Sequence, residues 1–500
     1  MGRIHIFVSE IATKKRIILI LSTLTFLILV GVIGIDVMST EPFIQEDAAL
    51  CLLSWLGVLL FIWSLITWHA VRKEFICPYV LFLCCNYFFM YGQSFLWAFG
   101  IEGVPDLRDS FPSYQIIRAQ VFTVLSLGFF HIGALYVAAK RSDKIEPDIQ
   151  YDNYANKVKI LLKSTQLVGW ILFVVSIIPF ASILAGQLKM SHSYGYGVLY
   201  DPALIRVGFG AIRNNLSQFF IPSLICLFIG YMKKPVFLSF ILIFMLMRMV
   251  IAFYVGGRSP AMVMLLCMIC MWHYFIGKID FKKALVLILA AYLLISTLPI
   301  IGSYRAMPNR GFEDLVSAFT FGIGKSENFI KAISEIGGSM FPLIQAMNLM
   351  PVEYSFRYGE SYFYSFFSLV PNLGLWQAHP AFQNANLGDW LQKILSLRYG
   401  PGFSPAAEAY YNFGWMGIIV MFVLGVFYGW VFTLISRNNA WREPAISSFV
   451  FIIFSFTAMT SRNSFIGTVR AIFYYAVPIY IAIILVARVF KRPKADYVLR

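Results

Sequence analysis

Apolar runs of about 18 or more residues recur from one end of the chain to the other. Each run is long enough to cross a lipid bilayer as an α-helix. The sequence is 59% hydrophobic and only 13% charged, whereas soluble domains carry roughly 25% charged residues. The sequence therefore predicts an all-α polytopic membrane protein and excludes a soluble enzyme.

We predict twelve transmembrane helices and one long loop. The predicted spans are 17–35, 48–68, 76–99, 117–139, 165–188, 215–232, 235–255, 260–277, 283–301, 409–435, 445–460 and 465–488. The first span is long and lacks a small-residue cleavage site, so we interpret it as a retained helix rather than a signal peptide. The predicted divisions are 1–139 (helices one to four), a polar cytoplasmic linker at 140–164, 165–301 (helices five to nine), a large loop at 302–408, and 409–500 (the last three helices and a basic tail).

The net charge of +15 is explained by membrane topology. The predicted inner segments carry 24 Lys and Arg against 9 Asp and Glu, and the rest of the chain carries 16 of each kind. Because inner loops of membrane proteins are enriched in Lys and Arg, this distribution places both termini in the cytoplasm and the loop 302–408 outside. The positive charge is therefore no indication of a nucleic-acid partner.

The basic residues differ in kind between the two sides. Beyond the predicted inner segments there are 12 Arg but only 4 Lys, and topology gives no reason for this preference. Arg binds phosphate and carboxylate groups in a bidentate manner, which favours a site for a pyrophosphate or another polyanion. A single arginine at a span end is more often a snorkelling residue, so the hypothesis rests on the set. The candidates are Arg206, Arg213, Arg258, Arg305, Arg310, Arg398 and Arg462.

Carboxylates and aromatic residues complete the candidate site. Glu408 lies in GFSPAAEAYYNFG, where the chain re-enters the membrane, and a carboxylate at such a boundary suits a general base. The alternative is that Glu408 only stabilises the first turn of the following helix, and the sequence supports both interpretations equally. Glu360 and Tyr410 are candidate substrate-binding residues, although aromatic side chains that stack on sugars also line membrane interfaces.

The motifs that the sequence lacks limit the reactions that the protein could catalyse. The sequence contains neither a GxxxxGK[ST] nor a GxGxxG motif, and its outer loops hold no DxD pair and no histidine cluster with metal-ligand spacing. We therefore predict no metal and no cofactor, and an enzyme on the outer side must use an already activated substrate. None of the seven cysteines lies in the long loop, so no disulfide is expected there. Two short amphipathic helices are predicted in that loop, at 326–336 and 387–397.

The chain resembles the O-antigen (oligosaccharide repeat-unit) polymerases of the Wzy type. The resemblance rests on the plan of about a dozen spans with one long outer loop, on the GGRSP turn at 256–260, on SYRAMPNR at the start of the loop and on GFSPAAEAYYNFGWMGI at its end. It covers most of the chain in architecture and residues 250–465 in motifs. Similar helical plans recur among lipid-dependent glycosyltransferases of type C.

The resemblance implies a glycosyltransferase of the bacterial inner membrane that acts by block transfer in lipopolysaccharide biosynthesis. The donor would be a growing glycan on undecaprenyl pyrophosphate, and the acceptor a single repeat unit on the same carrier. A chain-length regulator protein is a further candidate partner. In this scheme Arg258, Arg305 and Arg462 would stabilise the pyrophosphate leaving group, and Glu408 would take the proton of the acceptor hydroxyl. The substrate-binding candidates are Arg206, Arg213, Arg310, Arg398, Tyr410 and Glu360.

Two other functions fit the same plan. A ligase that moves finished glycan onto lipid A-core would have a similar architecture and would use a loop histidine. The late-loop histidine is His379 in QAHPAF, whose surroundings do not resemble the ligase motif. A flippase for the lipid-linked repeat would explain the spans and a cationic interior. It would not need a loop of about a hundred residues, and the sequence shows no repeat between its halves of the kind that transporters often have.

Overall fold

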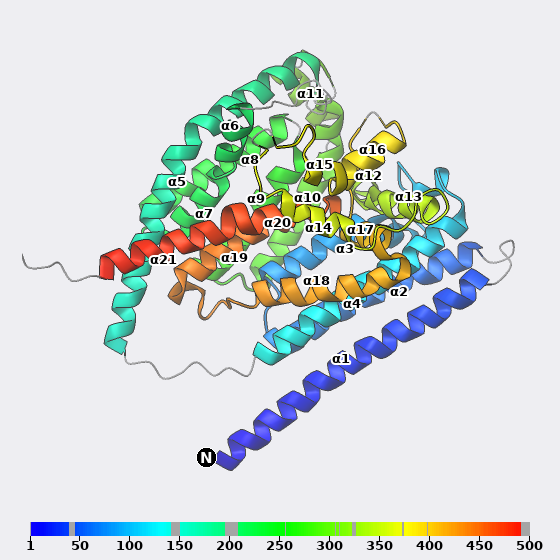
Figure 1. The fold of residues 1–500 in the computed structure, drawn as a ribbon, viewed down its shortest axis with the longest axis horizontal. Coiled ribbons are helices and arrows are strands. Elements are labelled where there is room, and N and C mark those ends of the chain that lie inside the picture. Colours follow the sequence, from blue (N-terminus) through cyan, green and yellow to red (C-terminus); the bar gives the residue numbers. More distant parts are fainter. Residues whose placement is uncertain are drawn as a thin grey trace, which may run out of the picture.

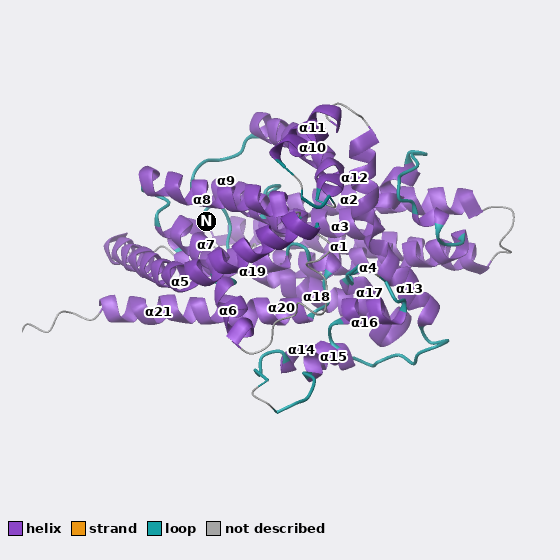
Figure 2. Ribbon diagram, turned by 90° about the horizontal axis from the view of Figure 1, so that it is seen from above, coloured by secondary structure: helices purple, strands orange, loops and turns teal. Residues whose placement is uncertain are grey.

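The computed structural model describes residues 2–39, 46–141, 151–195, 209–255, 257–305, 307–309, 311–322, 327–372, 375–397 and 399–491. All regular structure in these ranges is helical (Figures 1 and 2). Eleven helical segments of the described chain are long and apolar enough to cross a membrane. The predicted all-α polytopic fold is therefore confirmed.

The spanning segments follow the predicted order. They are α1 (Gly2–Ser39), α2 (Glu46–Arg72), α3 (Pro78–Ala98), α4 (Ser113–Arg141), α5 (Tyr151–Tyr194), α6 with α7 (Phe209–Ser217 and Phe220–Gly230), α8 (Pro235–Val255), α10 (Phe281–Tyr304), α17 with α18 (Pro405–Phe413 and Gly417–Phe432), α19 (Pro444–Thr457), and α20 with α21 (Ile466–Arg470 and Val477–Lys491). The remaining predicted span, 260–277, is helix α9 (Arg258–Phe275), which is not one of the eleven because Arg258 and His273 make its ends polar.

Two predicted boundaries need correction. Helix α5 begins at Tyr151, inside the polar linker expected at 140–164. Val158 and Leu161 are buried on one face of this helix and Lys157 and Lys159 are exposed on the other, so the polar stretch is an amphipathic extension of the span. The span expected to begin at 409 begins at Pro405 instead, because Ser404 and Pro405 form a helix start.

Helix α4 is the centre of the N-terminal part of the bundle, where it packs against α1, α2 and α18. Gly425 and Gly429 of α18 face the backbone of Phe130 and Ala134 in α4, so the two helices approach closely. Small residues at such contacts are typical of membrane helices, because packing rather than the hydrophobic effect drives their association. In the other part of the bundle α5 packs on α7 and α21, and α19 packs on α7.

The segment between α10 and α17 is largely helical and lies at one end of the bundle, which we call the loop side. Its helices are α11 (Phe312–Gly322), α12 (Glu327–Gly337), α13 (Phe341–Leu349), α14 (Glu360–Phe367), α15 (Pro380–Asn384) and α16 (Leu387–Ile394). The two predicted amphipathic helices are confirmed as α12 and α16. The other four, α11, α13, α14 and α15, were not predicted, and the last three have nine residues or fewer.

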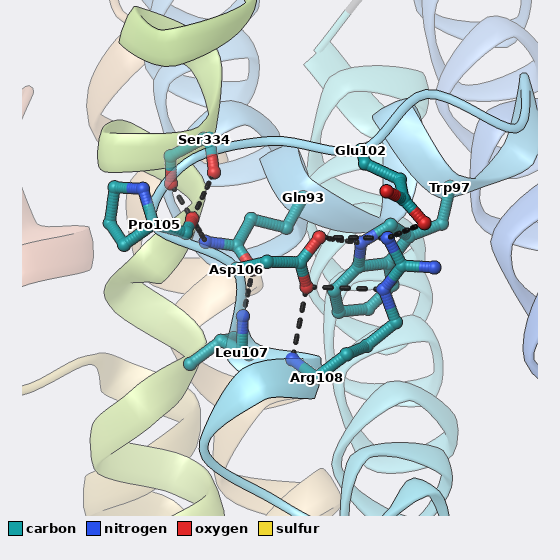
Figure 3. Close-up of polar contacts among 8 residues, drawn as sticks. All are labelled: Gln93, Trp97, Glu102, Pro105, Asp106, Leu107, Arg108 and Ser334. Atoms are coloured by element: carbon teal, nitrogen blue, oxygen red, sulfur yellow. Dashed lines mark hydrogen bonds and ion pairs between the residues drawn. The ribbon is translucent and has the colours of Figure 1, made fainter.

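Helix α12 is fixed against α3 by a set of polar contacts that we call the α12 clamp (Figure 3). The Gln93 amide of α3 donates to the carbonyl oxygens of Ser334, at 3.0 Å, and Pro105, at 2.9 Å, and its Oε1 accepts from Leu107 N at 2.9 Å. The Ser334 hydroxyl also donates to the Pro105 carbonyl. Beside this contact Gly92 and Gly337 bring the two backbones together without side chains between them. The clamp thus joins α3, the loop 99–112 and α12.

An ion pair holds the loop of the clamp in place. Arg108 binds the Asp106 carboxylate with two hydrogen bonds, of 3.1 and 2.9 Å, and Trp97 Nε1 donates to Asp106 Oδ2 at 3.1 Å (Figure 3). Burial alone would raise the pKa of Asp106, but the hydrogen bonds from Arg108 and Trp97 outweigh burial and lower that pKa below its ordinary value. Asp106 therefore remains a carboxylate and a strong acceptor.

The α4–α18 contact gives a testable prediction. A methyl group at Gly425 would collide with the Phe130 carbonyl, so Gly425→Ala should destabilise the protein by about 1–3 kcal/mol through overpacking. Gly186, in α5, has nothing within 4 Å of an added Cβ, and Gly186→Ala should be neutral or slightly stabilising. Thermal unfolding of the purified proteins in detergent checks both. Equal melting temperatures for the two variants would contradict the close α4–α18 packing.

Candidate functional site

Glu408 lies in the first turn of α17, at the point where the chain returns to the bundle from the loop side. The Ser404 hydroxyl caps this helix by accepting from Ala407 N at 3.1 Å, and Pro405 occupies the first helical position. Both residues favour a helix start. The local sequence SPAAE therefore places the Glu408 carboxylate one turn inside the bundle, where it is only 1% exposed.

Both oxygens of the Glu408 carboxylate are held by donors from distant parts of the chain. The Ser361 hydroxyl of α14 donates to Oε1 at 2.7 Å, and the backbone N–H of Phe465 donates to Oε2 at 2.6 Å. Asn412, one turn further along α17, donates to the Ser361 hydroxyl at 2.8 Å and accepts from Gly359 N at 3.0 Å. One carboxylate thus brings together α14, α17 and the turn that precedes α20.

A small cavity lies beside this carboxylate. Its volume is about 20 Å³, which is room for one water molecule or one hydroxyl group. The lining comes from α3, α4, α14, α17, α18, α20 and the segment that joins α19 to α20. The residues that line it are Phe82, Asn86, Met90, Leu127, Phe130, Tyr362, Pro405, Glu408, Met421, Leu424, Tyr428, Thr460, Asn463, Phe465 and Thr468.

Two hydroxyl groups of this lining have no hydrogen-bond partner within the described protein. They belong to Tyr362 and Thr460. Burial, reinforced by the charge of Glu408, raises the pKa of Tyr362 well above its usual value, so the phenol remains a protonated donor. A buried donor without a partner is costly, which indicates that the cavity suits a small polar group near Glu408.

Arg258 joins three helices on the loop side. It is the first residue of α9, and its Nη1 donates to Glu335 Oε2 of α12 at 2.6 Å and to the carbonyl oxygen of Leu298 in α10 at 3.3 Å. Both charged side chains are about one-fifth to one-quarter exposed, at 21% and 24%. Gly302 lies against the guanidinium, and Arg305 follows Gly302 by one turn at the end of α10. The structure therefore puts Arg258 and Arg305 at the same end of α10.

Arg462 is linked through α3 to the helix that carries the partner of Arg258. Its guanidinium lies 5.9 Å from the centre of the Phe89 ring. Phe89 is one turn before Gln93, which holds Ser334 next to Glu335. The Arg462 carbonyl accepts from Phe403 N at 3.2 Å and so also holds the segment that leads into α17. Arg462 therefore contacts α3 with its side chain and the segment before α17 with its backbone.

The other predicted residues make separate contacts. Arg213 of α6 donates to the Ser182 hydroxyl at 3.2 Å, and Glu360 pairs with Arg357 at 3.5 Å. Tyr410 is 2% exposed, and its ring packs edge-on among Phe122, Phe356 and Trp415. Arg206, Arg310 and Arg398 lie outside the described residues.

Several residues of the site were not predicted from the sequence. Asn412 had a signal, since it follows Glu408 by four residues and so shares its helix face. Ser361, Tyr362 and Thr460 had none, because their contacts with the Glu408 region join positions far apart in the chain. Glu335 was one of many loop carboxylates, and its pairing with Arg258 depends on how α12 sits on α3.

Variants of Glu408 separate its contribution to folding from any contribution to chemistry. Glu408→Ala should destabilise the protein by about 1–3 kcal/mol for each donor left unsatisfied, namely the Ser361 hydroxyl and Phe465 N. Glu408→Gln keeps the shape and one acceptor oxygen, so its melting temperature should lie near that of the wild type. Thermal unfolding in detergent measures both. A stable Glu408→Ala variant would show that the two short hydrogen bonds contribute little.

A family model described as O-antigen polysaccharide polymerase Wzy matches residues 17–494 of the chain. The match runs from the first spanning segment through the last helix, and it includes every residue of the site described above. No curated protein and no solved structure matches the chain.

Proposed function

The match covers nearly the whole chain, so the protein belongs to the O-antigen polysaccharide polymerase family, and we propose that it joins undecaprenyl-pyrophosphate-linked repeat units by block transfer on the outer face of the bacterial inner membrane. Family membership and the many membrane helices support a polymerase of the multi-pass type. The observation that carries the finer proposal is the position of Arg258 on the loop side, where its guanidinium lies against Gly302, one turn before Arg305.

The proposed reaction moves one glycan between two carriers. The terminal hydroxyl oxygen of the acceptor repeat attacks the anomeric carbon of the donor glycan. The bond between that carbon and the pyrophosphate oxygen breaks, its electron pair stays on the oxygen, and undecaprenyl pyrophosphate leaves. The hydroxyl proton passes to a carboxylate. Each cycle lengthens the glycan by one repeat and consumes no nucleotide.

Arginines can stabilise this leaving group without a metal ion. Charge develops on the pyrophosphate as the glycosidic bond breaks, and fixed donors in a site shielded from water stabilise it strongly. Arg258 already holds one carboxylate, Glu335, at 2.6 Å. A pyrophosphate carries more charge than a carboxylate and accepts bidentate hydrogen bonds from guanidinium groups, so it can replace Glu335 as the partner of Arg258. Arg305 and Arg462 complete the proposed set, and Arg213 is the next candidate.

Glu408 is the proposed base. Each of its oxygens accepts one hydrogen bond in the structure, and a carboxylate has about four lone-pair sites, so it retains capacity for a proton. The adjoining cavity holds about one hydroxyl group or one water molecule. The acceptor hydroxyl would reach Glu408 there, directly or through a single water, with the Tyr362 hydroxyl as a further hydrogen-bond partner.

Glycan ladders from cells test this proposal. Deletion of the gene should leave lipid A-core that carries a single repeat and no ladder, and the wild-type gene should restore the ladder. Arg258→Lys, Arg305→Lys and Glu408→Gln should reduce the ladder by at least about tenfold. The two Lys variants weaken an interaction with the charge that develops on the leaving group, and Glu408→Gln removes the proton acceptor. Arg462→Lys should have a smaller effect in the same direction.

Expression and melting temperature of each variant provide the control, together with Arg488→Lys at the opposite end of the bundle, which should keep a full ladder. Bare core with long polymer on undecaprenyl pyrophosphate would identify a ligase instead. Single repeats accumulating on the cytoplasmic side would identify a flippase. Full ladders from all four stable variants would contradict the assignment of the site.

A further inference from the structure

A group of basic side chains lies at the end of the bundle opposite the loop side, the end that the sequence predicts to face the cytoplasm. Three segments carry it: the first part of α5, the connection 231–234 between α7 and α8, and the short helical turn Ala440–Arg442 before α19. Helix α8 separates the connection 231–234 from Arg258 on the loop side. Helices α5, α7 and α19, which pack on one another, bring the three segments together (Figure 1).

Two of these cations meet at one indole ring. The Lys233 Nζ lies 5.5 Å from the centre of the Trp441 ring, and the guanidinium carbon of Arg442 lies 5.1 Å from a ring centre of the same side chain. Next to them in the chain, Glu443 Oε1 pairs with Lys157 Nζ of α5 at 3.1 Å. We call these five residues the Trp441 cluster. Its contacts join three separate segments, so the fold assembles the cluster rather than a local run of charge.

The segments of the Trp441 cluster carry far more positive than negative charge. Among the described residues 155–163, 231–234 and 440–443 there are six bases and one acid, Glu443, which is already paired with Lys157. The six bases are Lys157, Lys159, Lys163, Lys233, Lys234 and Arg442. Like charges gathered in this way repel one another, and an anion placed between Lys233 and Arg442 would relieve that repulsion.

The cluster lies where the apolar surface of a membrane helix begins. Helix α8 is a spanning segment that starts directly after Lys234. The side chains of Val236, Phe237 and Phe240 in its first two turns are 46–67% exposed, so this part of the helix faces lipid. Tyr231 stacks on Phe237 with ring centres 4.8 Å apart, and aromatic residues of this kind mark the boundary between lipid and water. The Trp441 cluster therefore lies at the level of the lipid headgroups.

The surroundings of the cluster select an anion that carries an apolar body. We propose that the Trp441 cluster binds the phosphate headgroup of an anionic phospholipid between Lys233 and Arg442. The phosphate accepts hydrogen bonds from the ammonium and guanidinium groups, and the acyl chains lie along the exposed start of α8. Basic pockets between membrane helices hold anionic headgroups by the same attraction. This site is far from the proposed reaction and does not depend on it.

Photo-crosslinking at two exposed phenylalanine positions tests the site. Benzoylphenylalanine replaces Phe237, beside the cluster, or Phe281, in the full chain reconstituted in nanodiscs of phosphatidylethanolamine and phosphatidylglycerol. Phe281 is the matched control, because it starts the spanning helix α10 at the same end of the bundle, is 84% exposed and is followed by Lys282 and Lys283. One lipid at a time is radiolabelled, and the ratio of phosphatidylglycerol label to phosphatidylethanolamine label is measured at each position.

The proposal predicts a label ratio about tenfold higher at Phe237 than at Phe281. Equal ratios at the two positions would overturn it, because the label would then report ordinary contact with lipid. An excess of inorganic phosphate should leave the label at Phe237 unchanged. Competition by inorganic phosphate would also overturn the proposal, since the cluster would then bind a free anion rather than a headgroup.

Matched charge variants connect the label to the cluster. Lys233→Gln combined with Arg442→Gln should lower the label ratio at Phe237 to the value of the control position. Lys278→Gln combined with Lys282→Gln removes the same charge at the same end of the bundle and should leave the ratio unchanged. Equal losses in the two double variants would show that only the general charge of this surface matters, which would contradict a defined site.

Thermal unfolding in detergent is an independent measurement, because a ligand that binds the folded state raises its stability. Added phosphatidylglycerol should raise the melting temperature of the wild type but not that of the variant lacking Lys233 and Arg442. The same rise in both proteins would refute the site. Lys233 is exposed, so Lys233→Gln alone keeps the test valid if the double variant fails to fold, and it should lower the label ratio at Phe237 about threefold. An unchanged ratio would refute the role of Lys233.

Discussion

The ion pair between Arg258 and Glu335 is the interaction on which the proposed site depends. It connects the first turn of α9 with α12, and the same guanidinium also binds a carbonyl oxygen of α10. A charged side chain at the edge of a bilayer must be paired or must face a polar space, since its insertion into the apolar region costs several kcal/mol. Arg258 thus joins three helices, and in the proposed function it supplies the charge that an anionic substrate would require.

That ion pair in turn depends on the α12 clamp. Glu335 directly follows Ser334, whose backbone and hydroxyl are held by Gln93 and by the loop 99–112. The loop is fixed by the pairing of Asp106 with Arg108. The N-terminal helices therefore set the position of a residue that pairs with the middle of the chain. A similar convergence holds Glu408, whose donors come from α14 and from the turn that precedes α20.

Much of the fold could be predicted because the bilayer imposes a simple rule on the sequence. Each span is a long apolar run. The hydropathy signal for a span was weaker where a helix is polar at its ends, as α9 is. It was also weaker where a helix continues past its apolar run as an amphipathic segment, as at the start of α5. The short loop helices α13 and α14 gave no periodic pattern.

The site was predictable only in part. Residue type and position singled out Arg258, Arg305 and Glu408 as candidates, because a charge at a span boundary stands out against an apolar background, and their roles stay predictions. Their partners Glu335 and Ser361 are separated from them by 77 and 47 positions, and nothing local in the chain indicates these pairings. Tyr410 appeared to be a sugar-stacking candidate by its type, whereas its ring is packed among three aromatic neighbours.

The most direct measurement uses the purified protein in liposomes with one substrate, an undecaprenyl-pyrophosphate-linked repeat unit, a chelator and no nucleotide. The account predicts a ladder of longer glycans on the carrier, with one undecaprenyl pyrophosphate released for each repeat added. A ladder that forms only with added divalent cation, or release of carrier without any longer glycan, would contradict it.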